Sequence, residues 1–325
     1  MQNNSQSNSL EYAIERICYR VRSLSYFYAR FHIAFCSFLS LQFLFFLLFF
    51  PSFSHSTFSP FVLAFFFLTL FSYFVLFFFF QTKKTEQLLT FQEEFSLFCK
   101  IKYANQLDRA KATHRSAHAL EREEISIYKT KTPFKGLNPV IEKCKNKLHW
   151  KIFFEMKEIL LKNGVMEIVS LIKKSPMDLE PHKILAESYT ELALLYILKS
   201  KVFLWVPSAY LSESMQKQFL FSSQKAVEEY KILQIYGETS SWIHTKLAQI
   251  YHLQGNIKGE VQEQEELLLL DPHHEGALAR LGILYFEQGN QAKGLEIYAR
   301  LQEVSLETSS EIIKFYDLHH QNLFS

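Results

Sequence analysis

Two long apolar stretches dominate the first quarter of the chain, and a short polar segment separates them. Residues 31–50 and residues 61–80 contain no charged residue. About 20 apolar residues in a helix rise roughly 30 Å, the thickness of the hydrocarbon core of a bilayer. A helix in the core of a soluble protein keeps a polar face, and these stretches have none. The pattern therefore predicts two transmembrane helices.

The polar segment, residues 51–60 (PSFSHSTFSP), predicts a tight reversal between the two spans. Pro51 and Pro60 bracket it, and proline disfavours helix continuation because it lacks an N–H. The segment carries no Lys, Arg, Asp or Glu, whereas both outer flanks are basic. By the positive-inside bias, we expect an antiparallel hairpin with both termini cytoplasmic and the small loop exported. The flanking cations are Arg16, Arg20, Arg22 and Arg30 on one side and Lys83, Lys84, Lys100 and Lys102 on the other.

The residues before the first span allow two interpretations. Residues 1–9 are polar and predict a tail. From Leu10 to Arg30, apolar residues recur at helical spacing with arginines between them. This segment is either a helix on the membrane surface or an extension of the first spanning helix. A cleaved signal peptide is disfavoured, because the apolar region is too long and no small-residue cleavage site follows.

After the second span, residues 81–147 predict an amphipathic linking helix followed by a loop. Leu88, Phe91, Phe95 and Phe98 recur at spacings of three and four, and no Gly or Pro interrupts the chain up to about residue 131. A coiled coil is an open alternative. Two prolines and a glycine in residues 131–139 (KTPFKGLNP) end the segment.

The C-terminal part contains an internal repeat. Residues 246–256 (KLAQIYHLQGN) and 280–290 (RLGILYFEQGN) match at a constant offset of 34 residues. Leucine, a small residue, tyrosine and a Gln-Gly-Asn turn recur in the same order, and Asp271–Pro272 closes the first unit. In period and residue types, residues 241–304 resemble the tetratricopeptide repeat (TPR). The matched packing residues are Leu247, Ala248, Tyr251, Leu281, Gly282 and Tyr285.

The resemblance extends upstream with departures. Residues 183–236 resemble a third unit, with its first helix in 183–201 and Ala226, Tyr230 and Leu233 in its second, and residues 202–216 form an insertion. Residues 150–174 predict a further helix–Asn-Gly–helix pair. Gln264 occupies a position where the family has an aromatic residue, and residues 311–323 predict a final solvating helix. Since about three repeats are needed for a continuous core, we expect a repeat domain over 148–325.

The resemblance implies a partner-binding groove lined by the first helix of each repeat. The Lys and Asn residues with which some TPR proteins hold a terminal carboxylate are not matched, so binding there is expected to be apolar. The implied groove residues are Trp242, Thr245, Gln249, His252, Leu253, Gly276, Ala279, Ile283, Phe286 and Glu287.

Charge and motifs exclude several kinds of chemistry. The formal net charge of +2 does not favour nucleic acid. The four cysteines lack paired spacing, which argues against a disulfide framework or a zinc site. Phosphate-binding and hydrolase motifs are absent from the sequence. His114 and His118 are one helical turn apart, but we interpret them as a solvated face. We therefore expect no enzyme activity, no metal site and no cofactor.

The sequence predicts an all-α protein: a two-helix transmembrane hairpin, a linking helix and a TPR-like α-solenoid. The predicted function is a membrane-anchored adaptor or scaffold that contacts lipid through residues 31–80 and binds a protein or peptide at the cytoplasmic face. The hairpin, with both ends cytoplasmic, also resembles bacterial inclusion-membrane proteins, whose soluble arm faces a host cytosol. A bacterial inner-membrane protein or a subunit of a membrane enzyme or transport complex are the alternatives.

Overall fold

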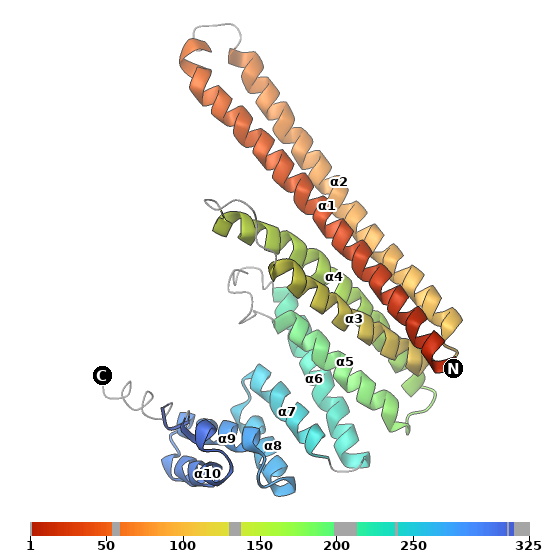
Figure 1. Ribbon diagram of the computed structural model, residues 1–325, viewed down its shortest axis with the longest axis vertical. Helices are drawn as coiled ribbons and strands as arrows, with labels where there is room; N and C mark the ends of the chain where they lie inside the picture. Colours follow the sequence, from red (N-terminus) through yellow and green to blue (C-terminus); the bar gives the residue numbers. More distant parts are fainter. Residues whose placement is uncertain are drawn as a thin grey trace. The chain divides into compact units, whose positions relative to one another are not determined.

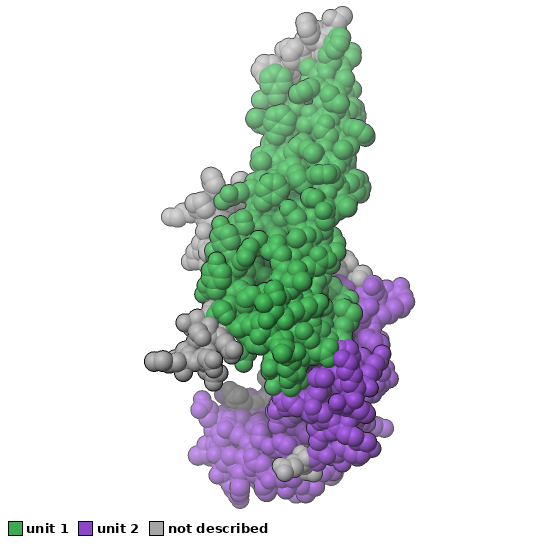
Figure 2. Space-filling view, turned by 90° about the vertical axis from the view of Figure 1, so that its right-hand side faces the viewer, with its two compact units in different colours: residues 1–167 green, residues 168–325 purple. Residues whose placement is uncertain are grey.

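The computed structural model describes residues 2–53, 59–129, 138–197, 213–237, 240–310 and 312–314. Within these ranges the chain is almost entirely helical and contains no β-strand, which confirms the predicted all-α class for them. The chain divides into two compact units, Met1–Glu167 and Ile168–Ser325 (Figure 2). The boundary between the two units lies at Glu167.

Two long helices form the apolar hairpin of the first unit. Helix α1 spans Gln2–Phe53 and helix α2 spans Ser59–Lys102, and they run side by side in opposite directions (Figure 1). Their segments Ser9–Leu48 and Pro60–Lys102 are long and apolar enough to cross a membrane. Helix α1 continues without a break from residue 2, so the structure has neither a separate surface helix over Leu10–Arg30 nor a non-helical tail. It also passes Pro51 by two residues, and residues 54–58 of the predicted connector lie outside the described residues.

Polar side chains of the apolar stretches meet at the seam between α1 and α2. His32 Nδ1 lies 3.1 Å from the Tyr73 hydroxyl, and Gln42 Nε2 donates to Thr69 Oγ1 at 3.2 Å. On α2 a series of partly buried positions recurs at spacings of three and four, and most of the large apolar side chains between them are exposed. The positions of this series are Val62, Phe66, Thr69, Tyr73, Phe77 and Phe80, and Leu70 and Ser72 are also partly buried.

The N-terminal half of α1 and the C-terminal half of α2 form a bundle with α3 (Gln106–Lys129) and α4 (Asn138–Ile172). One side chain from each helix, Val21, Leu88, Leu120 and Phe153, has no exposed surface in their shared core. The prediction of a single linking helix is wrong, because α2 ends at Lys102 and three non-helical residues separate it from α3. Asn105 favours this break, since its Oδ1 accepts from the backbone N–H of Leu107 at 3.0 Å.

Helix α4 corrects the predicted helix pair over residues 150–174. The helix runs straight through Asn163 and Gly164, without a turn. A Cβ atom on Gly164 would lie 2.8 Å from Thr113 Oγ1 on α3. The glycine therefore serves close packing between two helices, a role that its Asn-Gly context does not reveal.

Among its described residues, the second unit contains three successive helix pairs. They are α5 (Leu179–Ile197) with α6 (Glu213–Tyr236), α7 (Ser241–Gln254) with α8 (Ile257–Leu270), and α9 (Glu275–Glu287) with α10 (Gln291–Val304). The last two pairs turn at Gly255 and Gly289, whose φ angles are 69° and 73°. This left-handed conformation favours glycine.

Each of these turns is followed by a capping asparagine. The side chains of Asn256 and Asn290 accept hydrogen bonds from the backbone N–H groups of Gly259 and Lys293. The Gln-Gly-Asn sequence therefore ends one helix and begins the next within three residues. It does so twice, 34 residues apart.

Candidate functional site

The predicted groove residues lie on α7 and α9, and most of them reach the surface. Gln249, His252, Gly276 and Glu287 are exposed. The partly exposed members are Trp242, Thr245, Leu253, Ala279 and Ile283. The two helices come close enough for a direct side-chain contact, since Arg280 Nη2 on α9 lies 2.8 Å from His252 Nδ1 on α7.

The six residues matched as repeat packing are all buried. Leu247 and Ala248 on α7 are at most 1 % exposed. A Cβ atom on Gly282 would meet Ile297 and Ile312 at 3.5 Å, which is an ordinary contact. The remaining members are Tyr251, Leu281 and Tyr285.

Tyr285 combines an apolar ring with a polar tip. Its hydroxyl donates to the Glu265 carboxylate on α8, and Lys293 Nζ lies 5.1 Å from the ring centre. Burial raises the pKa of Tyr285, and the hydrogen bond to Glu265 raises it further. The phenol therefore stays protonated and ties the second helix pair to the third.

Phe286 corrects the predicted groove, because it is only 5 % exposed. Its ring lies over Gly294 on α10, where any Cβ atom would collide with the ring atoms. The absence of a side chain at residue 294 is the physical reason that an aromatic ring fits between α9 and α10. Phe286 thus belongs to the core of its helix pair and does not line a groove.

The same two positions in the preceding repeat hold a polar pair. His252 and Glu260 precede Phe286 and Gly294 by 34 residues. His252 Nδ1 lies 3.2 Å from Glu260 Oε2, and the Glu260 side chain is only 4 % exposed. A buried carboxylate needs partners to offset its lost hydration. In this helix pair, the polar contact between His252 and Glu260 takes the place of the contact between the Phe286 ring and Gly294 in the last pair.

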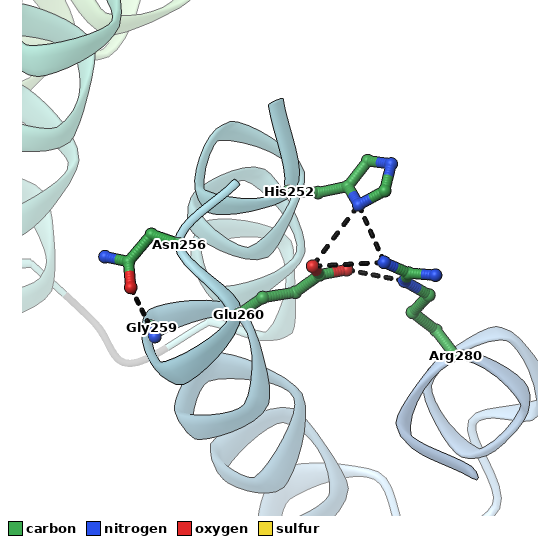
Figure 3. Close-up of polar contacts among 5 residues, drawn as sticks. All are labelled: His252, Asn256, Gly259, Glu260 and Arg280. Atoms are coloured by element: carbon green, nitrogen blue, oxygen red, sulfur yellow. Dashed lines mark hydrogen bonds and ion pairs between the residues drawn. The ribbon is translucent and has the colours of Figure 1, made fainter. Parts of the chain in front are cut away.

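Arg280 completes this polar cluster (Figure 3). Its Nε donates to Glu260 Oε1 at 2.6 Å and its Nη2 to Glu260 Oε2 at 3.2 Å. Such a two-pronged arginine–carboxylate pair is among the stronger hydrogen-bonded contacts in proteins. Asn256 fixes the first turn of α8, which carries Glu260, by capping Gly259 at 3.1 Å. The cluster therefore joins α7, α8 and α9 through side chains.

His252 has one ring nitrogen, Nδ1, between a donor and an acceptor. When Nδ1 carries no proton it accepts from Arg280, and when it is protonated it donates to Glu260. The imidazole is 52 % exposed, so its other edge is open to solvent. His252 is therefore more exposed than Arg280 and Glu260, its two partners in the cluster.

A second histidine–glutamate pair lies deeper in the α7–α8 pair. His244 Nδ1 is 2.8 Å from Glu263 Oε2, and the two side chains are 3 % and 7 % exposed. The residue equivalent to His244 in the last repeat, 34 positions later, is the fully buried Leu278. Sequence reasoning missed this pair and Arg280. A signal for Arg280 was present, since Lys246 precedes it by 34 residues and is also basic.

An aromatic corner connects α5, α6 and α7 beside the groove. Trp242 meets the Tyr230 ring edge-on, with centroids 5.6 Å apart, and Lys183 Nζ lies 5.0 Å from the Trp242 ring centre. Tyr230 is fully buried, whereas Trp242 keeps part of its surface exposed. Trp242 is therefore a rigid, accessible aromatic side chain on the predicted groove.

Other sites considered from the sequence are placed as follows. His118 is exposed and lies 3.8 Å from Glu121 on the same helix, and the hydrogen bond from His118 lowers the pKa of Glu121. His274 caps α9 by accepting from the Ala277 N–H at 3.1 Å. Residues 202–212 of the predicted insertion lie outside the described residues.

Comparisons with known proteins add little to this geometry. No family model and no curated protein matches the chain. Among solved structures, the chain matches a protein described as a thermophilic TPR protein in Thermus thermophilus, at 14 % identity and a TM-score of 0.32, covering 70 % of this chain and 97 % of that one. No comparison supports the resemblance to inclusion-membrane proteins. The repeat interpretation therefore rests on the 34-residue correspondence and the helix pairs of the chain itself.

Proposed function

We propose that this protein is a membrane-anchored, TPR-like scaffold that binds a protein or peptide partner on the α7–α9 surface. The observation that carries the proposal is the exposure of large apolar side chains along both hairpin helices. Between Ile33 and Phe79 many leucine and phenylalanine side chains are exposed. Leu41 and Phe71, for example, are each 65 % exposed. Exposure of such an apolar surface to water is unfavourable, whereas the hydrocarbon core of a bilayer would cover it.

The seam of the hairpin supports the membrane location. His32 contacts Tyr73 and Gln42 donates to Thr69 between the helices, and all four side chains are partly buried. Polar groups in hydrocarbon are costly, and spanning helices commonly pair them in this way. The basic flanks favour both termini on the cytoplasmic side.

The second unit supports the binding role. Its helix pairs repeat at the period of TPR proteins, which as a family hold partners on the surface lined by the first helix of each pair. Arg280 on this surface is already paired with Glu260, so it offers little unpaired charge to a partner's carboxylate. The surface therefore favours a partner with apolar and aromatic side chains, received by Trp242, Leu253 and Ile283. We propose a binding role in preference to catalysis.

Two measurements test this function. In the first, the full chain is expressed and its membranes are washed with alkaline carbonate; retention in the pellet is expected for a spanning hairpin. In the second, a photoreactive amino acid replaces Gln249 on α7 or, as a control, the 76 % exposed Leu269 on α8. Crosslinks to a defined partner are expected from residue 249 and not from residue 269. Equal crosslinking from both positions would contradict a binding site on this surface.

A further inference from the structure

A group of cations lies where the bundle of the first unit meets the apolar hairpin. Three short stretches meet there: residues 26–31 of α1, 80–85 of α2 and 146–153 of α4. Together they contain five Lys or Arg residues and no Asp or Glu. The cations are Arg30, Lys83, Lys84, Lys147 and Lys151.

Contacts between α1 and α4 bring these stretches together. His149 Nδ1 on α4 lies 2.8 Å from Ser25 Oγ, and its ring meets the Tyr26 ring with centroids 4.8 Å apart. Arg30 follows Tyr26 by four residues, so it lies one helical turn closer to the apolar stretch on the same face of α1. Lys151 follows His149 by two residues on α4. Arg30 and Lys151 therefore both lie within about one helical turn of the level at which α1 meets α4.

The contact between α2 and α4 places Lys151 near Lys84. The Lys84 ammonium donates to Glu155 Oε1 at 2.8 Å, and its side chain is 4 % exposed. Burial lowers the pKa of Lys84; the Glu155 carboxylate opposes this shift, and the positive charge of Lys151 adds to it. One cation of the group is thus neutralised inside the bundle, beside another that stays at the surface.

The surface cations are only partly compensated. Lys83 pairs with Glu86 at 2.9 Å, one helical turn away, and both side chains are largely exposed. Arg30 and Lys151 are exposed, and neither forms an ion pair or hydrogen bond with any residue that the structure describes. Their guanidinium and ammonium groups are free to bind an anion. We call Arg30, Lys83, Lys147 and Lys151 the basic collar.

Aromatic rings mark the level of the collar along the hairpin. Phe27, Tyr28 and Phe31 all contact the Phe80 ring, with centroids 5.7, 5.8 and 4.6 Å from it. Aromatic residues gather at the boundary between hydrocarbon and headgroups in membrane proteins. If residues 31–50 and 61–80 span a bilayer, the collar lies at headgroup depth on the cytoplasmic side.

We propose that the basic collar binds the phosphodiester headgroups of anionic phospholipids. Clusters of Lys and Arg next to the cytoplasmic end of a span attract anionic lipid, and a guanidinium matches a phosphate in charge and in hydrogen-bonding geometry. Because α4 is packed on both hairpin helices, the collar is held in place by the bundle. This inference rests on the proposed membrane location and adds a specific lipid partner to it.

The test compares lipid binding to the full chain purified in detergent. Phosphatidylglycerol and phosphatidylcholine are added in equal amounts, and native mass spectrometry counts the adducts of each. The wild-type chain is expected to prefer phosphatidylglycerol. Each exposed collar charge removed, in Arg30→Gln and then Lys151→Gln, is expected to lower this preference about fivefold.

A matched variant separates the collar from net charge. Lys100→Gln with Lys162→Gln removes two exposed lysines of the same unit, and Lys100 lies 17 residues along α2 from Lys83, or about 25 Å. This variant is expected to keep the wild-type preference. Equal binding of both lipids by the wild-type chain would overturn the proposal. An equal loss of the preference for phosphatidylglycerol in the collar variant and in this control variant would also overturn it. Loss of the chain from phosphatidylcholine vesicles in a carbonate wash would instead contradict the membrane anchor itself.

Discussion

The ring of Phe286 occupies the space that a side chain at residue 294 would fill. This relationship explains why two helical glycines of the last repeat are not equivalent. Gly294 is covered by an aromatic ring, whereas the space beside Gly282 accepts a methyl group at ordinary contact distance. The two residues therefore form a matched pair for mutation.

We expect Gly294→Ala to destabilise the second unit by about 1–3 kcal/mol, because a new methyl group overpacks the core. Gly282→Ala should be neutral or stabilise it by up to about 1 kcal/mol, since alanine favours the helix more than glycine. The measurement is thermal and denaturant unfolding of a fragment that begins at Ile168, followed by circular dichroism. The fragment itself should be soluble and helical. Equal effects of the two substitutions would show that Phe286 does not cover residue 294.

Gly164 offers a similar test in the first unit. Gly164→Ala is expected to lower the unfolding free energy by about 1–2 kcal/mol, because its Cβ would crowd Thr113. Adding Thr113→Ala should recover part of this loss, since the clash is with the threonine hydroxyl. A double-mutant cycle in detergent measures the coupling. Independent effects of the two changes would indicate that Gly164 does not pack against Thr113.

The cluster around Glu260 predicts an asymmetric response to mutation. Arg280→Met should destabilise the second unit by about 2 kcal/mol, because it leaves a buried carboxylate with only His252 as a partner. Combining it with Glu260→Ala should cost less than Arg280→Met alone, since the unpaired charge is then gone. His252→Ala, at an exposed side chain, is the control and should change stability by less than about 1 kcal/mol. Unfolding curves of the same fragment provide the stabilities. A double variant that is less stable than both Arg280→Met and Glu260→Ala would contradict the pairing of these two residues.

Cysteine reactivity reports the packing of the bundle. Burial raises the pKa of the Cys18 thiol to about 12 and that of Cys99 to about 12. Because a raised thiol pKa keeps the reactive thiolate scarce at neutral pH, both residues should resist N-ethylmaleimide in the folded chain and react after denaturation. Peptide mapping by mass spectrometry provides the rates, and equal rates for Cys18 and Cys99 before and after denaturation would argue against the bundle.

Membrane topology is tested at residue 54, in the predicted connector. In a chain whose four native cysteines are replaced by serine, Ser54→Cys should react with a membrane-impermeant maleimide added outside, and not with one confined to the cytoplasmic side. The basic flanks are the reason for this orientation. Labelling only from the cytoplasmic side would contradict the hairpin.

Features set by short-range chemistry could be predicted from the sequence. Residues 31–50 and 61–80 are helical because a continuous apolar stretch satisfies its backbone hydrogen bonds most readily within one helix. The turns at Gly255 and Gly289 follow from a residue type that accepts positive φ, with asparagine as the cap. Their spacing of 34 residues was therefore visible without a structure.

Contacts between helices could not be predicted in this way, because they depend on which side chain faces which. Asn163–Gly164 is typical of a turn, yet Thr113 on another helix makes Gly164 a packing residue. His252 and Phe286 hold equivalent repeat positions, but one is exposed and the other buried. The partner on the next helix decides the outcome: Glu260 requires a polar neighbour, and Gly294 leaves room for a ring. The sequence by itself determined the two apolar helices and the period of the repeats, and the tertiary structure decided which of their residues remain accessible at the surface.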